Sequence, residues 1–237
     1  NIEYMDKLVG KLMAELDKQH LREKTVVIFT GDNGTATFGA EQATVDGKHI
    51  SGKKGMMLEG GSRVPLAVTW PGHTPKGKVN NDLIDFSDFF STFTELTGAK
   101  PPEGVKLDSH SFAPQIEGKK GSPRDWVYVE LNGRSYARDA KFKLTRRGDM
   151  FDLSEAPFKE IPVAADTKDK DAVAARTALQ LVLDDHQALP RKPVDKQQQQ
   201  HKKNHKAQRA RRQAAAAHTA QRPPANELPR PHAHRAA

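Results

Sequence analysis

The stretch Thr25-Val-Val-Ile-Phe-Thr-Gly-Asp-Asn-Gly34 is the strongest indication of the fold. Its apolar run, residues 26–30, has no polar alternation, which predicts a β-strand covered on both faces, as in a parallel sheet. Two glycines bracket Asp32 and Asn33, and glycine allows a sharp turn or a close backbone approach. In α/β proteins, ligands bind at the carboxyl ends of such strands. The stretch therefore predicts an α/β fold with a polar site directly after this strand.

The chemistry of that polar pair leaves two interpretations open. Asp32 and Asn33 offer a carboxylate and an amide oxygen, which are hard donors suited to Ca²⁺ or Mg²⁺. The same residue types are typical of an ordinary tight turn. Asn33-Gly34-Thr35 also matches a glycosylation acceptor pattern, but a strand end facing a cleft is a poor place for a bulky glycan.

A second segment, residues 52–72, carries three further motifs in order. They are Lys54-Gly55, Glu59-Gly-Gly-Ser-Arg-Val-Pro65 and Trp70-Pro-Gly72. With Asp32-Asn33-Gly34 before them, these motifs resemble the sulfatase family in identity, order and spacing. That family has a strand ending in Asp-Asn-Gly, a Lys-Gly segment, Glu-Gly-Gly-x-Arg-x-Pro, and a strand ending in Trp-Pro-Gly.

The resemblance extends over residues 1 to about 190 through segments that also predict regular structure on their own. Residues 4–16 place their apolar side chains at helical spacing. Residues 83–98 resemble the family's next helix and end in a glycine stop. Residues 141–144 and 150–154 are similar to hairpin strands of the family's small carboxyl-terminal subdomain. The remaining predicted elements are a strand at 126–130 and a closing helix at 171–186.

The resemblance implies an α/β fold: a partial alkaline-phosphatase-like core with a mixed, mostly parallel sheet flanked by helices, and a small antiparallel subdomain behind it. We assign residues 1–105 to the core and residues 106–190 to the subdomain. Residues 191–237 form a third, basic segment.

Site residues follow from the resemblance as well. It implies that Asp32 and Asn33 are two ligands of one divalent cation, usually Ca²⁺ with Mg²⁺ as the alternative, and that Lys54 contacts a sulfate oxygen of the substrate. A fixed cation and an ammonium would stabilise the negative charge that develops when a sulfate monoester is cleaved. Lys53 is the neighbouring candidate if the motif is displaced by one residue. The substrate would be a glycan, aryl or small-molecule sulfate.

Other residues near these motifs receive lesser roles. Glu59 and Arg63 are interpreted as structural, with Arg63 holding loop carbonyls or a carboxylate. His49 is a candidate for the border of the site. The loop at residues 35–53 is expected to help select the sulfate ester, because long loops at strand ends commonly line clefts.

Parts of the family's machinery are missing from this sequence. Sulfatases attack with a formylglycine made from a Cys or Ser in Cys/Ser-x-Pro-x-Arg, yet this chain has no Cys, and Ser122-Pro-Arg124 has the wrong spacing. The paired aspartates that complete the metal site are also absent. We therefore expect the carboxyl-terminal part of a longer sulfatase, with formylglycine in the missing part and little activity alone. The alternatives are a phosphomonoester or phosphonate hydrolase of the same superfamily, or an inactive chain with an anion-binding tail.

Charge is distributed unevenly along the chain. Residues 191–237 contain 12 Lys and Arg against 2 acidic residues, and the whole chain carries +8, so residues 1–190 carry −2. This low-complexity tail has almost no large apolar residue, which predicts disorder. It also lacks aromatic residues that stack on bases, so no specific nucleic-acid partner is expected.

The sequence contains no apolar run approaching the ~20 residues of a membrane span. Sulfatases are generally exported or lysosomal, and this resemblance is the basis for expecting a periplasmic, extracellular or lysosomal location.

Overall fold

A computed structural model of the chain describes residues 2–105 and 107–188, which belong to one unit, Asn1–Ala188. The basic tail predicted at residues 191–237 lies outside the described residues. The boundary between core and subdomain after residue 105 stays a prediction. No helix in the described part of the chain is both long and apolar enough to cross a membrane.

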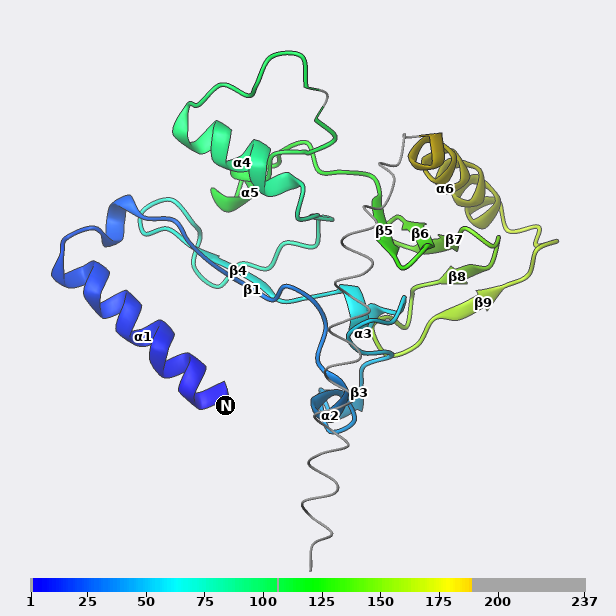
Figure 1. Cartoon of the computed structure of the whole chain (residues 1–237), viewed down its shortest axis with the longest axis horizontal. Helices are drawn as coiled ribbons and strands as arrows, with labels where there is room; N and C mark the ends of the chain where they lie inside the picture. The colour runs from blue at the N-terminus through cyan, green and yellow to red at the C-terminus, as the bar shows by residue number, and fades with distance from the viewer. Residues whose placement is uncertain (1, 106, 189–237) are drawn as a thin grey trace, which may run out of the picture. The chain divides into compact units, whose positions relative to one another are not determined.

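The amino-terminal half contains helices and short strands joined by long loops (Figure 1). In chain order the elements are α1 (Ile2–Lys18), η1 (Arg22–Lys24), β1 (Val27–Thr30), α2 (Thr37–Ala40), β2 (Thr44–Val45), β3 (Lys48–His49), α3 (Glu59–Ser62), β4 (Leu66–Thr69) and α4 (Asp88–Thr97). The helix predicted at residues 4–16 is confirmed as α1, and the predicted strand at 26–30 as β1.

The pairing of β1 differs from the sequence-based prediction. β1 pairs with β4 in antiparallel orientation, with Val27 opposite Thr69 and Thr30 opposite Leu66. All four residues of β1 are half-buried rather than fully covered. The parallel neighbour inferred from the unbroken apolar run is therefore wrong for this pair. An unbroken apolar run indicates that a strand is buried, but it does not determine whether the neighbouring strand is parallel or antiparallel.

The carboxyl-terminal half is built on a five-stranded antiparallel meander (Figure 1). After α5 (Ala113–Ile116), its elements are β5 (Val127–Leu131), β6 (Arg134–Arg138), β7 (Phe142–Thr145), β8 (Met150–Asp152), β9 (Ile161–Val163) and α6 (Lys170–Ala188). The strands lie in sequence order, each pairing with the next. The predicted small antiparallel subdomain and its closing helix are both confirmed at the level of these elements.

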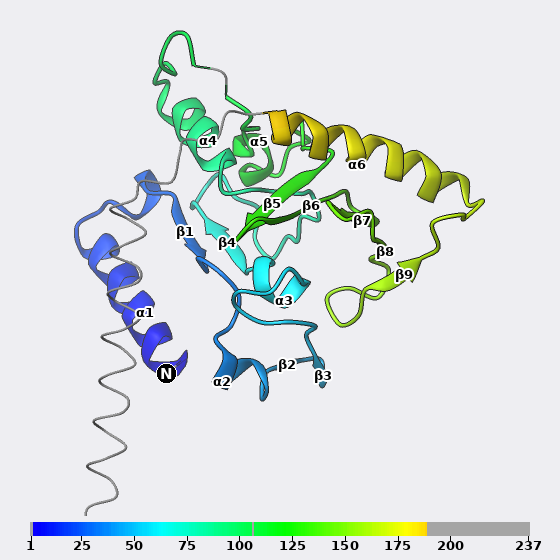
Figure 2. The ribbon, with the colours of Figure 1, turned by 45° about the vertical axis from the view of Figure 1, so that its right-hand side comes forward.

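The main hydrophobic core lies between this sheet and α6. Its buried residues are Ala137, Phe142, Leu144 and Met150 from the sheet, and Ala172, Ala175, Leu179, Val182 and Leu183 from the helix. Figure 2 shows α6 along one side of the sheet and α3 on the other. Because side chains alternate between the faces of a strand, the residues between these core positions point away from α6. That second face is important for the site described below.

The helix predicted at residues 83–98 begins later, at Asp88, and a hydrogen-bonded turn from Asp85 to Asp88 precedes it. The Asp85 carboxylate accepts hydrogen bonds from the amide and hydroxyl of Ser87, and the Asp85 amide donates to Asp88 Oδ2 at 2.7 Å. These bonds fix the turn that leads into α4. The predicted glycine stop is confirmed, since Gly98 has φ 68° at the end of α4.

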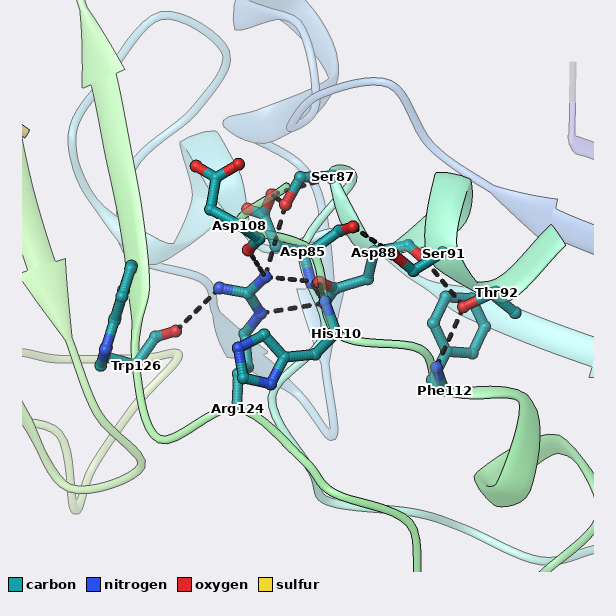
Figure 3. Close-up of polar contacts among 11 residues, drawn as sticks. Asp85, Ser87, Asp88, Ser91, Thr92, Asp108, His110, Phe112, Arg124 and Trp126 are labelled. Carbon is teal, nitrogen blue, oxygen red and sulfur yellow. Dashed lines mark hydrogen bonds and ion pairs between the residues drawn. The ribbon is translucent and has the colours of Figure 1, made fainter. Parts of the chain in front are cut away.

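A buried ion pair joins α4 to the segment that leads into β5 (Figure 3). Arg124 Nε donates to Asp88 Oδ2 at 2.9 Å, and Arg124 Nη2 contacts Asp88 Oδ1. Arg124 also donates to the carbonyl of Trp126 at 3.1 Å. Arg124, which belongs to the Ser-Pro-Arg sequence that lacks the spacing of a formylglycine motif, thus has a structural role.

The same pair sets the acidity of Asp88. Burial by itself would raise the pKa of this carboxyl, but hydrogen bonds from Arg124 and from the amides of Asp85 and His110 outweigh that effect, so its pKa lies below the ordinary value of 3.8. A carboxyl with a depressed folded-state pKa stabilises the fold above its unfolded pKa, and this stabilisation is lost as the pH falls through the folded pKa.

We predict that Asp88→Asn lowers the free energy of unfolding at pH 7 by about 3–5 kcal/mol, because it leaves Arg124 buried without its counter-ion. The difference between wild type and variant should narrow below about pH 4, because Asp88 becomes protonated first in the unfolded wild-type chain and, at lower pH, in the folded one. Urea unfolding from pH 7 to pH 3 measures both quantities. A difference that stays constant over this range would contradict the assignment.

Candidate functional site

The turn after β1 presents the two predicted metal ligands. Asp32 is exposed and Asn33 is half-buried. Within residues 2–105 and 107–188, neither side chain has a hydrogen bond or ion pair to another residue. The turn itself is anchored through its backbone, since the Gly34 amide donates to the Gly61 carbonyl at 3.1 Å. Both oxygen donors are therefore held on a fixed turn and remain available to a ligand.

Backbone packing around this turn leaves no space for side chains. A Cβ atom at Gly34 would lie 1.8 Å from the Gly60 oxygen, and one at Gly61 would lie 2.1 Å from the Met56 oxygen. A Cβ at Gly60 would lie 2.4 Å from the Gly52 oxygen. Gly34 thus lets the backbones of two separate loops touch, and Gly60 and Gly61 let their own loop fold closely on itself.

Lys54 lies on the loop that packs against this turn. Its amide donates to the Thr35 carbonyl at 2.9 Å, so the lysine segment and the Asp32-Asn33 turn are tied together two residues after Asn33. Its side chain is exposed and has no polar partner among the residues that the structure describes. Lys53 differs, because its Nζ lies 3.5 Å from Glu41 Oε1. Of these two lysines, Lys54 is the one whose ammonium is available.

Asp32 and Asn33 offer the kind of oxygen donors that a hard divalent cation prefers, but they are only two. A carboxylate and an amide oxygen suit Ca²⁺ or Mg²⁺, yet Ca²⁺ takes ~6–8 oxygen ligands. No group of three or more His, Cys, Asp or Glu residues capable of holding a metal occurs in the described part of the chain. Asp32 and Asn33 would therefore supply part of a coordination shell.

Glu59 and Arg63 belong to a group of ion pairs around α3. Glu59 is 1% exposed, and its Oε1 accepts a hydrogen bond from Arg138 Nη1 of β6 at 2.8 Å. Arg63 Nη1 lies 3.5 Å from Glu59 Oε2. These contacts support the structural interpretation of both residues, because they join α3 to the carboxyl-terminal sheet.

A second contact to the sheet involves Tyr136. Its hydroxyl lies 2.6 Å from Ser62 Oγ, and burial raises the pKa of Tyr136 to about 12. The phenol therefore stays protonated at neutral pH and serves as a neutral hydrogen-bonding group.

Sequence reasoning missed Lys143, which is 1% exposed. In the sequence it alternates with Phe142 and Leu144, a pattern that predicts a polar residue facing solvent. The second face of the sheet is instead covered by residues 51–62, and Lys143 Nζ donates to the Met57 carbonyl at 2.6 Å. No signal in the local sequence identifies this contact.

The role of His49 at the border of the site stays a prediction. It is exposed in the short β2–β3 hairpin, and its Nδ1 lies 3.3 Å from the Ala43 carbonyl, a contact within the same loop.

A cleft of about 950 Å³ lies beside the site rather than at it. Residues from β1, β4, the 74–89 segment, β5 and β6 line it, including Arg63, Arg138 and Phe86. Asp32, Asn33 and Lys54 do not line this cleft. The segments that carry these three residues are joined by backbone contacts between loops, outside the lining of this cleft.

Comparison with known proteins identifies similar sequences. Residues 1–99 match the family model described as Sulfatase. The chain is 35% identical to human N-acetylgalactosamine-6-sulfatase over 113 residues, which cover 47% of this chain and 22% of that protein. It is 35% identical to human arylsulfatase A over 145 residues, covering 59% of this chain and 28% of that protein. The chain thus spans about a quarter of the length of these curated relatives.

Comparison of structures supports the same fold. A protein described in work on glycosaminoglycan metabolism by Bacteroides thetaiotaomicron superposes with a TM-score of 0.62 over 78% of this chain and 43% of its own, at 22% sequence identity. The α/β fold class inferred from the motifs is confirmed by this likeness. The sequence match and the shared fold agree, and residues 1–99 are similar to the sulfatase family.

Proposed function

We propose that this chain supplies part of the active site of a sulfuric ester hydrolase that acts on sulfate monoesters. In this proposal Asp32 and Asn33 bind a divalent cation, with Ca²⁺ preferred and Mg²⁺ as the alternative, and Lys54 binds a sulfate oxygen. The observation that carries the proposal is the backbone contact of the two loops. It supports the proposal because it joins the backbone of Lys54, whose ammonium has no polar partner among the described residues, to the turn that carries the two oxygen donors, in a segment that matches the sulfatase family model.

The chemistry expected of Lys54 follows from its charge and exposure. Cleavage of a sulfate ester increases negative charge on the sulfuryl oxygens and on the leaving oxygen. An ammonium held beside the sulfuryl group stabilises that charge more strongly in the transition state than in the bound ester. A bound divalent cation would add Lewis-acid stabilisation of the same oxygens. Lys53 is less suited to this role, because Glu41 already neutralises it.

The substrate class proposed is a sulfate monoester on a glycan, an aryl group or a small molecule. The curated relatives are named for N-acetylgalactosamine-6-sulfate and aryl sulfate activities, and the structural relative for glycosaminoglycan metabolism. Among these, a sulfated glycan is the first substrate to test. Export from the cytoplasm is proposed on the same family basis.

We predict that Lys54→Ala lowers kcat/KM for a sulfate monoester by about 10²–10³-fold, the range seen when one charge-stabilising donor is removed. Lys53→Ala is the matched control and should change kcat/KM less than about threefold, because Lys53 pairs with Glu41 at the protein surface. Steady-state kinetics of the full protein encoded by the gene measure both. Equal losses for the two variants, or a larger loss for Lys53→Ala, would contradict the placement of Lys54.

Metal dependence is expected to require both oxygen donors. Treatment with a chelator should abolish turnover, and added Ca²⁺ should restore it in the wild type. Asp32→Ala should raise the Ca²⁺ concentration needed for half-restoration by about tenfold or more, because affinity depends on ligand charge and number. Asn33→Asp keeps an oxygen donor and adds a negative charge, so half of its turnover should be restored at a Ca²⁺ concentration no higher than the wild type needs. Turnover that survives chelation unchanged would argue against a metal at this turn.

The close packing of the two loops predicts a steric requirement for glycine. Gly34→Ala should lower the free energy of unfolding by about 1–3 kcal/mol, because the new methyl group overlaps the Gly60 carbonyl. It should also lower turnover by up to about 100-fold by moving the ligand turn. Gly10→Ala is the control, since a Cβ at that helical position meets nothing within 4 Å and should stabilise α1 by roughly 0.5–1 kcal/mol. Thermal melts and turnover of both variants test this, and a fully active Gly34→Ala protein would refute it.

A further inference from the structure

The loop that carries Lys54 rests on one face of the carboxyl-terminal sheet. We define the Lys54 loop as residues 51–62. Side chains at alternate strand positions share a face, so Arg134, Tyr136 and Arg138 lie opposite Ala137, which packs on α6. Four side chains of this face contact the Lys54 loop: Arg134 Nη2 to Gly55 O (3.4 Å), Tyr136 OH to Ser62 Oγ (2.6 Å), Arg138 Nη1 to Glu59 Oε1 (2.8 Å) and Lys143 Nζ to Met57 O (2.6 Å). In addition, the Ser51 amide of the loop donates to the Pro157 carbonyl in the β8–β9 connection at 2.8 Å.

Lys143 is the centre of this face. Its ammonium donates to the Met57 carbonyl at 2.6 Å and to both carboxylate oxygens of Glu160 at 2.7 Å. An ammonium has three N–H donors, and three acceptor atoms surround this one. The rings of Tyr136 and Phe151 lie 4.5 and 5.7 Å from Nζ and add cation–π contacts.

The environment makes the bond to Met57 stronger than an ordinary backbone contact. The side chains of Lys143 and Glu160 are 2% and 3% exposed, so water does not compete for the ammonium. A charged donor in such a site forms a short and directional hydrogen bond. The acceptor, Met57 O, is on the loop three residues after Lys54, while the Lys54 amide is fixed on the other side by Thr35 O.

We propose that Lys143 is a positioning residue for Lys54. Its ammonium fixes the backbone of the Lys54 loop at Met57, and the exposed Lys54 side chain therefore starts from a defined point beside the Asp32-Asn33 turn. This inference rests on the proposed function of Lys54 in binding sulfate. A group that holds a reacting or binding residue in place contributes to rate through orientation, and small displacements are costly.

The test uses the double variant Lys143→Met/Glu160→Met in the full protein encoded by the gene. Lys143→Met alone would leave the Glu160 carboxylate buried and unpaired, which is expected to destabilise the fold, whereas replacing both charges with apolar side chains is often tolerated. The matched control is Lys141→Met, the same substitution beside β7, where the ion pair with Asp171 is exposed.

The first readout is amide hydrogen exchange, which needs no turnover. The double variant should keep the melting temperature of the wild type within a few degrees, while the amides of Lys54 and Met56 exchange about tenfold faster. Lys141→Met should leave both amides unchanged. Unchanged exchange at Lys54 and Met56 in the double variant would overturn the proposal. An increase spread evenly over β5–β9 would also overturn it, because it would show a general loss of stability.

The second readout is a cycle of kcat/KM values with Lys54→Ala. The double variant should lower kcat/KM by about tenfold when Lys54 is present, and should have no further effect in the Lys54→Ala background, since a positioning residue acts through the group it positions. If the double substitution lowers kcat/KM by the same factor with Lys54 present and in the Lys54→Ala background, the proposal is overturned. If Lys54→Ala alone retains full turnover, the proposed function of Lys54 fails, and the exchange measurement still decides whether Lys143 holds the loop.

Discussion

The candidate site depends on direct contact between two backbones. The turn after β1 and the Glu-Gly-Gly turn approach so closely that a single methyl group at Gly34 would overlap the Gly60 carbonyl. At this separation two hydrogen bonds form between the segments, from the Gly34 amide to the Gly61 carbonyl and from the Lys54 amide to the Thr35 carbonyl. Two segments that are separated by a loop in the sequence are thus joined through their backbones, and they carry the two oxygen donors and the lysine of the proposed site.

The carboxyl-terminal sheet has two faces with different tasks. One face packs apolar residues against α6 and provides the main core of the described chain. The other presents buried charges and a phenol to the Lys54 loop, through Arg138, Tyr136 and Lys143. Buried ion pairs contribute little net stability compared with apolar packing, but their geometry is specific. The first face therefore stabilises the subdomain, and the second fixes the position of a loop.

Much of the local structure could be predicted from sequence, because it depends on short-range patterns. Helical spacing predicted α1 and α6, the residues at 126–130 predicted β5, and the family resemblance predicted β7 and β8, whereas β6 and β9 were not predicted. The motif match indicated Asp32, Asn33 and Lys54, and their roles remain proposals. Two features could not be predicted. The antiparallel direction of β4 beside β1 depends on a long connection, and the burial of Lys143 depends on a loop about 86 residues earlier in the chain.

The distance along the chain between the Lys54 loop and its supports also governs when the loop can be ordered during folding. Its contacts to Tyr136, Arg138 and Lys143 have sequence separations of 74, 79 and 86 residues. On the ribosome, the loop emerges well before the strands that hold it, and contacts between distant residues form late because the intervening chain must first be closed. A nascent chain that ends before residue 160 has the whole motif from Asp32 to Arg63 but lacks the Glu160 carboxylate that holds the Lys143 ammonium in place. The assembly of the site is thus coupled to completion of the sheet, and the motif alone does not specify its own geometry.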